Sequence, residues 1–423
     1  MASRSDAGAD ADAPSESVAA ALASAGFVRI VPCADGDALA AGGLLARALR
    51  DVGVAFQVRV APFGADVSPV EDGLAVAVGA APSGADVTLA AAGAPSSLRA
   101  YEIAEALAAR HGGAAPDPVL ALAGVVAAGA HPGSAAGSLL EVAEAAGSIE
   151  RRPGVAIPVD DVVDGLAHST LVRAPFSGDT DAAAAELAGL TGTDSDERDA
   201  DGRRSIASHL ALGVAADEEA TPRAATAVER ALRPYATPQA PFETLGGFAD
   251  VLNATARERP GTGVAVALGH GGHGAAVDAW RTHGRAVHRA VRSAHTGRYD
   301  GVFVVRPNVR DADASGRAND PVVPGRLATV ARLVRDFRSP EPVVLALEDG
   351  VAALAAVDGG ADDAARALAS EFVAGDSTTA TWTAGPTAAL ARFDAETADA
   401  DVIAAVREAL QDSTDDSGRE VPE

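Results

Sequence analysis

The 423-residue sequence has no lysine, only one cysteine and no segment typical of a membrane span. One cysteine excludes an intramolecular disulfide framework and a cysteine-rich zinc site. The longest uncharged run, residues 118–140, is rich in glycine and small residues and predicts a buried helix that ends near Gly129. Residues 1–17 are small and acidic, lack a signal-peptide pattern and predict a disordered tail. These features predict a soluble, cytoplasmic protein with no membrane partner.

Basic charge is also scarce, because acidic residues outnumber basic ones by 25 and all 34 basic residues are arginines. In strong salt the Debye length falls to about 3 Å, so dense like charges are tolerated and keep a protein soluble. We interpret this composition as halophilic adaptation, which says little about a partner. A nucleic-acid-binding protein normally presents a basic face, and here only local arginine clusters could supply one.

Residues 27–60 have the clearest local pattern in the chain. A short apolar run at 27–32 predicts a buried strand, the next apolar residues recur at helical spacing as far as Gly53, and 54–60 predicts a second strand. Such β-loop-α-β units bind ligands beyond the carboxyl ends of their strands, where Asp35 and Asp37 stand.

Two interpretations of this aspartate pair remain open. Carboxylates at a strand end suit a divalent cation or phosphate chemistry. Alternatively, Asp37 caps the following helix with its charge at the positive end of the dipole, which the pair alone favours.

The string IVPCADGDALAAGGLLARAL resembles the first motif of the DHH phosphoesterase superfamily, which includes RecJ-type exonucleases. That motif is a strand followed by His-x-Asp-x-Asp-Gly and a helix. Here Cys33 replaces the His, Asp35 and Asp37 match the two Asp, and Ala38 replaces the Gly. The resemblance implies an α/β fold with a parallel-sheet DHH-type N-terminal domain, a helical connecting region and a smaller α/β DHH-associated C-terminal domain. The expected parts are a tail at 1–17, domains at 18–170, 171–296 and 297–410, and an acidic tail at 411–423.

The later motifs of this superfamily are matched in this chain by the expected strands and helix, but their metal-binding residues are replaced. The expected strand at 73–79 ends at Gly79 or Ala80 where the family has a metal-binding Asp. The strand at 86–92 runs into Ala90, Ala91 and Ala92 in place of the Asp-His-His triplet, and the helix that should end at a fourth Asp has Ala128 or Gly129.

These replacements bear on the chemistry. Two-metal hydrolysis needs enough carboxylates and imidazoles to hold two cations about 3.5–4 Å apart. Two Asp and one Cys cannot complete the coordination spheres of two cations, and a thiolate is a poor ligand for Mn²⁺ or Mg²⁺. We therefore expect no cofactor, with Mn or Mg at Asp35 and Asp37 as the alternative.

The middle of the chain is predicted to be helical, with an acidic exposed loop at 191–204 and helices at 205–212 and 224–232. Asn253, Ala254 and Arg257 fit an Asn-Ala-x-x-Arg pattern that joins the two lobes of RecJ-like archaeal proteins.

An arginine-rich helix is expected after the glycine-rich turn that carries His270 and His273. His283 and His288, five residues apart, do not share a helix face, so a zinc site is disfavoured. Arginines recur every three or four residues and share one face, which contacts nucleic acid or an acidic partner, or else is a solvated or salt-bridged surface. The candidate nucleic-acid-binding arginines are Arg257, Arg281, Arg285, Arg289 and Arg292, and Arg298 is expected on the same helix as the last four.

The last part reads as α/β, with strands at 301–306, 342–348 and 350–357 and helices at 325–337, 361–373 and 401–410. The segment WTAGPTAAL stands where the DHH-associated domain has a glycine run followed by His. Trp382, Thr383 and Ala384 replace the glycines, and Gly385 replaces the His. Side chains in place of glycine block close backbone approach. Trp382 is a candidate for base stacking, with core packing as the alternative.

The retained framework with several emptied motifs implies a change of role. We therefore interpret the chain as a catalytically inactive RecJ-like replisome scaffold of archaeal DNA replication or repair. By resemblance to the RecJ-like subunit of the CMG helicase, its expected partners are the GINS complex, the replicative helicase MCM and single-stranded DNA. The alternative is a metal-dependent single-strand exonuclease or small phosphoesterase that uses Asp35 and Asp37.

Overall fold

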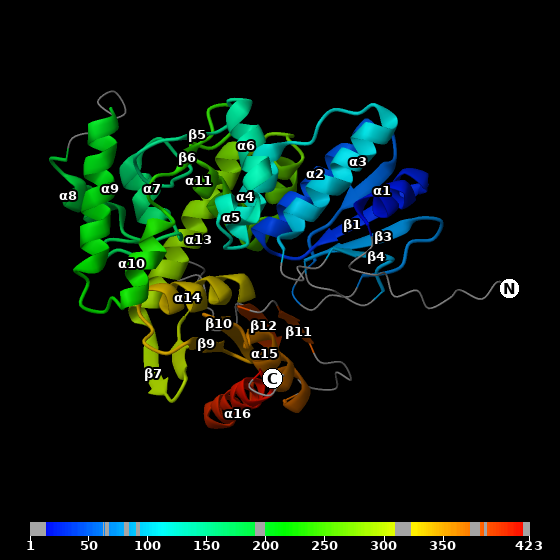
Figure 1. Cartoon of the computed structure of the whole chain (residues 1–423). Coiled ribbons are helices and arrows are strands. Elements are labelled where there is room, and N and C mark those ends of the chain that lie inside the picture. Colours follow the sequence, from blue (N-terminus) through cyan, green and yellow to red (C-terminus); the bar gives the residue numbers. More distant parts are fainter. Residues whose placement is uncertain are drawn as a thin grey trace, which may run out of the picture. The chain divides into compact units, whose positions relative to one another are not determined.

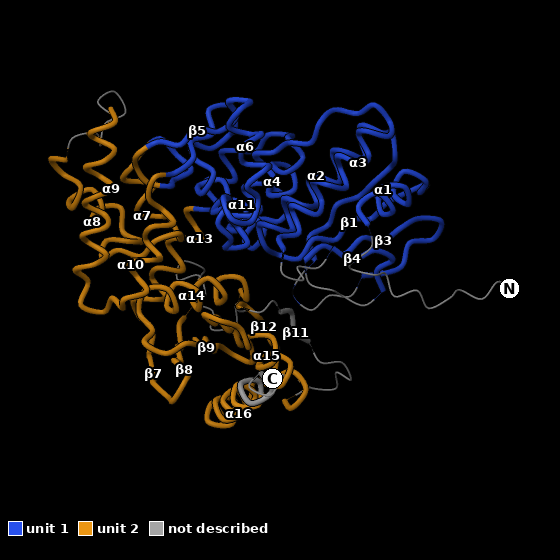
Figure 2. Tube along the Cα trace, in the orientation of Figure 1, with its two compact units in different colours: residues 1–152, 156–160, 234–280 blue, residues 153–155, 161–233, 281–423 orange. Residues whose placement is uncertain are grey.

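The computed structural model (Figure 1) describes residues 14–61, 63, 67–79, 84–89, 94–190, 199–308, 323–372, 381–384 and 387–417. The chain divides into two compact units, which Figure 2 colours separately. The first unit comprises Met1–Arg152, Ala156–Asp160 and Pro234–Trp280, and the second comprises Pro153–Val155, Asp161–Arg233 and Arg281–Glu423. The bounds of the three domains expected from the sequence remain predictions.

The first unit is a parallel sheet with helices packed on it. Its elements are α1 (Ser15–Ser24), β1 (Phe27–Pro32), α2 (Gly36–Asp51), β2 (Ala55–Val58), β3 (Leu74–Val78), β4 (Val87–Leu89), α3 (Ser96–His111), α4 (Pro118–Ala127), α5 (Pro132–Ala135), α6 (Gly137–Ala145), β5 (Glu150–Arg151), β6 (Tyr235–Ala236), α11 (Leu245–Glu258) and α12 (Pro260–Ala267). The long helix α13 (His273–Ser293) begins in this unit and ends in the second.

The sheet of the first unit has the strand order β2-β1-β3-β4 with every pair parallel in the described residues. The chain passes from β1 through α2 to β2 on one side and then returns to β3 on the other. This reversal brings the carboxyl ends of β1 and β3 together, and Val31 pairs with Ala77 just before both strands end. The helix α2 packs on α3, α4 and α11 and is mostly buried, because most of its residues are Ala, Gly and Leu.

The second unit consists of helices and a mixed sheet. Its elements are α7 (Val162–His168), α8 (Thr180–Leu187), α9 (Ala200–Ala215), α10 (Pro222–Glu229), β7 (His295–Tyr299), β8 (Val302–Arg306), α14 (Pro324–Phe337), β9 (Val343–Glu348), β10 (Val351–Ala356), α15 (Ala361–Glu371), β11 (Thr381–Ala384), β12 (Ala388–Arg392) and α16 (Asp399–Ser417).

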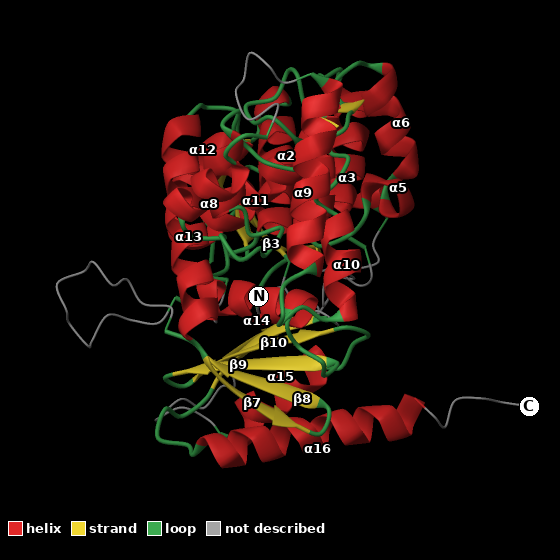
Figure 3. Cartoon of the chain, turned by 90° about the vertical axis from the view of Figure 1, so that its left-hand side faces the viewer, coloured by secondary structure: helices red, strands yellow, loops and turns green. Residues whose placement is uncertain are grey.

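The described strands of this sheet run in the order β11-β12-β10-β9-β8-β7, with β8 and β9 parallel and the other neighbours antiparallel. The helix α14 packs on β9 and β10, whereas α15 packs on β10, β11 and β12 and contacts α16. Figure 3 shows α14 and α16 on opposite faces of the sheet. Strand β10 is buried along its whole length, as a strand between two helical layers must be.

Several local predictions were wrong. The helix α1 begins at Ser15, so residues 15–17 are helical rather than disordered. The predicted loop at 191–204 includes the first turn of α9, which Asp199 caps, while residues 191–198 lie outside the described part. Arg298 lies in strand β7 rather than on the arginine-rich helix, because α13 ends at Ser293.

Candidate functional site

The candidate site includes the loop between β1 and α2. The backbone N–H of Cys33 donates to the carbonyl of Val78, which ties the end of β1 to the end of β3. Asp35 is the N-cap of α2, since its Oδ1 accepts from the N–H of Ala38 at 2.8 Å. The thiol of Cys33 donates to Oδ2 of Asp35 at 2.7 Å. Both oxygens of Asp35 therefore accept hydrogen bonds inside the loop.

Asp37 lies in the first turn of α2 and does not cap that helix, so the capping interpretation named the wrong aspartate. It is 6% exposed, and its oxygens accept from the backbone N–H groups of Ser96 at 2.6 Å and Ser97 at 3.0 Å. These are the first residues of α3, whose N-cap Pro95 makes no side-chain capping bond. Asp37 therefore satisfies the unpaired N–H groups of a second helix, 59 residues away along the chain.

Burial makes the carboxyl group of Asp37 a weaker acid than an ordinary aspartate. Desolvation and the negative charge of Asp35 raise the pKa of Asp37 to about 6, against an opposing effect of the hydrogen bonds from Ser97 and Ser96. A carboxyl group with this pKa takes up a proton under mildly acidic conditions. Its ionised form is disfavoured by burial and stabilised by the backbone N–H groups of Ser96 and Ser97.

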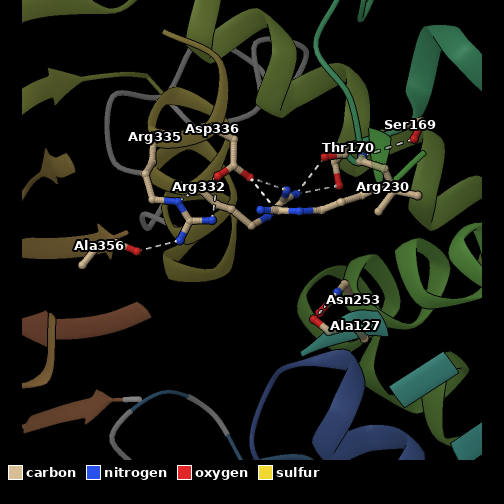
Figure 4. A network of polar contacts seen from close by, with 10 residues as sticks. Ala127, Ser169, Thr170, Arg230, Asn253, Arg332, Arg335, Asp336 and Ala356 are labelled. Atoms are coloured by element: carbon tan, nitrogen blue, oxygen red, sulfur yellow. Dashed lines mark hydrogen bonds and ion pairs between the residues drawn. The ribbon is translucent and has the colours of Figure 1, made fainter. Parts of the chain in front are cut away.

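Residues of α4 and α11 pack against this loop. The N–H of Gly36 donates to Oδ1 of Asn253 at 2.9 Å, and Nδ2 of Asn253 donates to the carbonyl of Ala127 at 3.2 Å (Figure 4). A β-carbon on Gly36 would lie 2.8 Å from the β-carbon of Ala127 and 2.9 Å from the backbone nitrogen of Asn253. Asn253 thus links the N-terminus of α2 to the C-terminal end of α4. The Asn-Ala-x-x-Arg pattern singled out this residue, although the pattern could not show its contacts.

The residues at this site do not fit a pair of hard cations. No group of three or more His, Cys, Asp or Glu side chains in the described ranges could hold a metal ion. Every carboxylate oxygen of Asp35 and Asp37 already accepts a hydrogen bond, and Gly79 supplies no side chain. Ala80, Ala90, Ala91 and Ala92, where the resemblance implies further ligands, lie outside the described residues.

The candidate arginines of α13 differ in their surroundings. Arg281 forms a bidentate ion pair with Asp164, with Nε to Oδ1 at 3.1 Å and Nη2 to Oδ2 at 2.7 Å. Arg292 donates to the carbonyl of Ser177, and exposed Arg285 approaches Nε2 of His168 at 3.5 Å. Arg289 is half-buried on the same helix, whereas half-buried Arg257 lies on α11 in the first unit.

The Asp164–His168 pair is a feature that the sequence reading missed. Nδ1 of His168 lies 3.0 Å from Oδ1 of Asp164. Burial raises the pKa of Asp164, but hydrogen bonds from His168 and Arg281 outweigh it and lower that pKa to about 2. The i, i+4 spacing of an Asp and a His on one short helix was the available signal.

The histidines of α13 have separate partners. Nε2 of His283 lies 3.0 Å from Oγ1 of Thr329, and Nε2 of His288 lies 2.8 Å from the carbonyl of Ser169. Desolvation lowers the pKa of buried His288 to about 3, so its ring is neutral at neutral pH. His273 begins α13 with its ring 6.0 Å from that of Phe242, and His270 precedes it.

The last two candidates lie at the β11–β12 hairpin. Trp382 is in β11 and pairs with Ala391 of β12. Gly385 lies outside the described residues. No helix in the described ranges has the length and apolar character needed to cross a membrane.

Comparison with solved structures defines the fold class. The structure of CDC45 from Entamoeba histolytica is similar to this chain with a TM-score of 0.54 and 8% identity, over 94% of this chain and 98% of that one. The structure of exonuclease RecJ bound to manganese gives a TM-score of 0.47 and 15% identity, over 94% of both chains. The α/β fold predicted from the DHH resemblance is confirmed, and the chain has a fold similar to that of CDC45.

Sequence comparison defines the family. The chain is 47% identical over 397 residues to the uncharacterized protein rrnAC1427 of Haloarcula marismortui, which covers 93% of this chain and 96% of the relative. Residues 294–408 match the family model described as the C-terminal domain of that protein. The chain belongs to the rrnAC1427 family.

Proposed function

We propose that the chain is a catalytically inactive RecJ-like scaffold in archaeal DNA replication or repair. In this role it binds the GINS complex and the replicative helicase MCM, and it contacts single-stranded DNA. The observation that carries the proposal is the use of Asp35 and Asp37, which hold the N-termini of α2 and α3 rather than facing an open cluster of ligands.

The neighbouring residues support loss of hydrolysis. The position where the superfamily has a His is occupied by Cys33, whose thiol donates to Asp35. A side chain at Gly79 would overlap that thiol, so a carboxylate at position 79 and the cysteine exclude each other. Hydrolysis by two metals requires a complete set of carboxylates and imidazoles around both ions.

Retention of the whole fold supports a binding role. The chain covers 98% of the CDC45 structure, although 8% identity adds evidence for the fold alone. Superfamily members with emptied sites, to which the sequence motifs point, serve as subunits of replicative assemblies. A scaffold needs the shape and surface of its ancestor but not the ligands, which matches the pattern of loss in this chain.

A nuclease assay tests the inactivity. The full-length protein, in molar KCl with Mn²⁺, is incubated with an end-labelled single-stranded oligonucleotide, beside the double variant Asp35→Ala/Asp37→Ala. We expect the oligonucleotide to remain intact in both samples. Degradation by the natural sequence that disappears in the double variant would overturn the proposal and establish the alternative, a metal-dependent exonuclease or phosphoesterase.

Two binding assays test the partners. Affinity capture of the full-length protein with purified GINS and MCM in molar KCl should retain both, and absence of GINS would contradict the replisome role. Fluorescence anisotropy of a labelled single-stranded oligonucleotide should detect binding to the protein. The affinity should be lower in the double variant Arg285→Gln/Arg289→Gln. The exposed Arg366→Gln on α15 is a control that removes one positive charge elsewhere.

A further inference from the structure

Strand β7 is an open edge of the sheet in the second unit. It ends the strand order, and β8 is the one described element with which it makes extensive contact. Four of its five residues are exposed, whereas α14 and α15 pack on strands further into the sheet. Figure 2 shows β7 at one side of this sheet and β11 at the other. Proteins usually protect such an edge with a proline, a bulge or a covering element, but β7 has no proline and pairs with β8 in a continuous register.

The β7–β8 hairpin determines which backbone groups point outward. Tyr299 pairs with Val302 across a two-residue turn, so these two residues exchange backbone hydrogen bonds. Alternation along the antiparallel ladder then puts Thr296 and Arg298 in non-hydrogen-bonded positions. Their backbone N–H and C=O groups therefore face the open edge, where no described residue pairs with them.

The side chains on one face of β7 suit an added strand. His295, Gly297 and Tyr299 lie on the sheet face where Val302 and Val304 enter the hydrophobic core. Tyr299 is 39% exposed, and a β-carbon on Gly297 would lie 3.2 Å from its Cε2, so the ring lies close to Gly297. A further strand beside β7 would remove apolar surface of this ring from water.

The charges around β7 favour a second copy of this chain in antiparallel orientation. Residues 279–299 include five arginines and no acidic residue, in a chain with 25 more acidic than basic residues, so two copies repel each other least here. Exposed Arg292 precedes β7, and exposed Asp300 follows it. Antiparallel pairing brings Asp300 of one copy to the end of β7 that carries Arg292 in the other, whereas parallel pairing would bring like charges together.

We propose that two copies of the chain form a symmetric dimer through their β7 strands, which pair in antiparallel orientation about a two-fold axis at Gly297. This register places Thr296 opposite the second copy's Arg298, so the outward backbone groups of both residues are paired. A register that set the two Arg298 residues opposite each other would bring like charges together. In the proposed register, Tyr299 lies opposite the second copy's His295, and the two glycines leave room for both tyrosine rings.

Sedimentation equilibrium of the full-length protein in molar KCl tests the association. A pair of five-residue strands is a small contact, so we expect a reversible monomer–dimer equilibrium with a dissociation constant on the order of micromolar. Molar salt shortens the Debye length to about 3 Å, which suppresses repulsion between the two acidic copies. A monomer at every protein concentration would overturn the proposal.

Thr296→Pro tests whether the β7 edge forms the contact. The N–H that this substitution removes faces the edge and not β8, so the variant should keep its fold, as circular dichroism can verify. We expect dimerisation to weaken by about tenfold or more, because each copy loses a backbone donor to the other. Tyr299→Ser should also weaken it and keeps the test decisive if Thr296→Pro does not fold. Val142→Ser on α6 is the control, since it removes an exposed apolar side chain of the first unit and should leave the equilibrium unchanged. Equal dissociation constants in all these proteins would refute the β7 contact.

Disulfide trapping tests the register. The double variant Gly297→Cys/Cys33→Ala has a single thiol, because Cys33 is the sole cysteine of the chain. In the proposed register the two residues at position 297 form a non-hydrogen-bonded pair with α-carbons about 4.5 Å apart, which a disulfide can span. We expect a cross-linked dimer under mild oxidation, and none in Leu212→Cys/Cys33→Ala, whose thiol lies on exposed α9. Equal cross-linking of the two variants, or none in either, would overturn the pairing at Gly297.

Discussion

A β-carbon built on Gly79 would overlap Sγ of Cys33, so the thiol at the end of β1 fills the space that a side chain at the end of β3 would need. The DHH resemblance implies one metal ligand at position 33 and another at position 79 or 80. Residues 33 and 79 are therefore physically linked, since a side chain cannot be added at position 79 while Cys33 keeps its place.

This relationship predicts an energetic coupling between the two positions. Gly79→Ala is expected to destabilise the protein by about 3 kcal/mol, from its φ of +90° and from the overlap with the thiol. Adding Cys33→Ala should recover about 1 kcal/mol or more, because the remaining β-carbon lies 3.4 Å away. Urea unfolding of both single variants and the double variant measures the coupling.

Gly112→Ala is the matched control for backbone strain. Gly112 has a φ of +74° and open space around its α-carbon, so its substitution should cost only about 1 kcal/mol. Equal costs at positions 79 and 112 would show that the overlap with Cys33 has no energetic effect.

The buried Asp37 predicts a distinctive pH dependence of stability. Its folded pKa of about 6 exceeds the ordinary 3.8, so its stabilising effect is fully present below pH 3.8 and is lost as the pH rises through 6. The shift corresponds to a loss of about 3 kcal/mol in the free energy of unfolding between pH 4 and 7. Thermal unfolding of the natural sequence and of Asp37→Asn, compared across this range, isolates the contribution.

Asp35→Asn is the informative companion to that experiment. Removing the negative charge of Asp35 eliminates one cause of the raised pKa, so the transition should move to lower pH. The same pH profile in Asp37→Asn as in the natural sequence would assign the titration to another group.

The sequence was sufficient to predict the β1-α2-β2 unit. Within 34 residues, the pattern of apolar residues changes from that of a strand to that of a helix and back to that of a strand. It placed two aspartates at the correct strand end but assigned the cap to Asp37 instead of Asp35. The hydrogen bonds from Ser96 and Ser97 decide the role of Asp37, and they join residues about 60 positions apart that no local pattern connects.

Three strands of the second unit escaped the sequence reading for a different reason. Strand β7 is an edge strand with the sequence HTGRY, which is mostly exposed and has no hydrophobic alternation. Strands β11 and β12 have the sequences TWTA and AALAR, and alanine is a poor strand former. Their pairing in the sheet overrides their local preference, and this pairing is a tertiary effect.

Substitutions of Arg281 and Arg285 on α13 should change the free energy of unfolding by different amounts. Arg281→Gln should lower the free energy of unfolding by about 1–2 kcal/mol, because Asp164 loses a bidentate partner. Exposed Arg285→Gln should change it by less than about 0.5 kcal/mol. Urea unfolding of both variants in the same salt tests the difference, and the reverse order would mean that the ion pair contributes nothing.

The pH dependence of the same ion pair has a definite sign. Asp164 has a folded pKa of about 2, below the ordinary 3.8, so its contribution is present above pH 3.8 and is lost as the pH falls through 2. In Arg281→Gln the folded pKa of Asp164 should return toward its ordinary value. The difference in stability between the natural sequence and the variant should therefore shrink during acid unfolding, and a constant difference would exclude Asp164 as the partner that matters.

The buried pair of Trp280 and Asp250 gives the last prediction. Nε1 of fully buried Trp280 donates to Oδ2 of Asp250 at 2.8 Å, and the carboxylate is itself only 2% exposed. Trp280→Phe removes this donor and leaves unfilled volume, so it should cost about 3 kcal/mol. Asp250→Asn keeps an oxygen acceptor for the indole and should cost less. Urea unfolding measured by circular dichroism provides both values, and a larger cost for Asp250→Asn would show that the charge of Asp250, rather than its bond to Trp280, stabilises the helix pair α11 and α13.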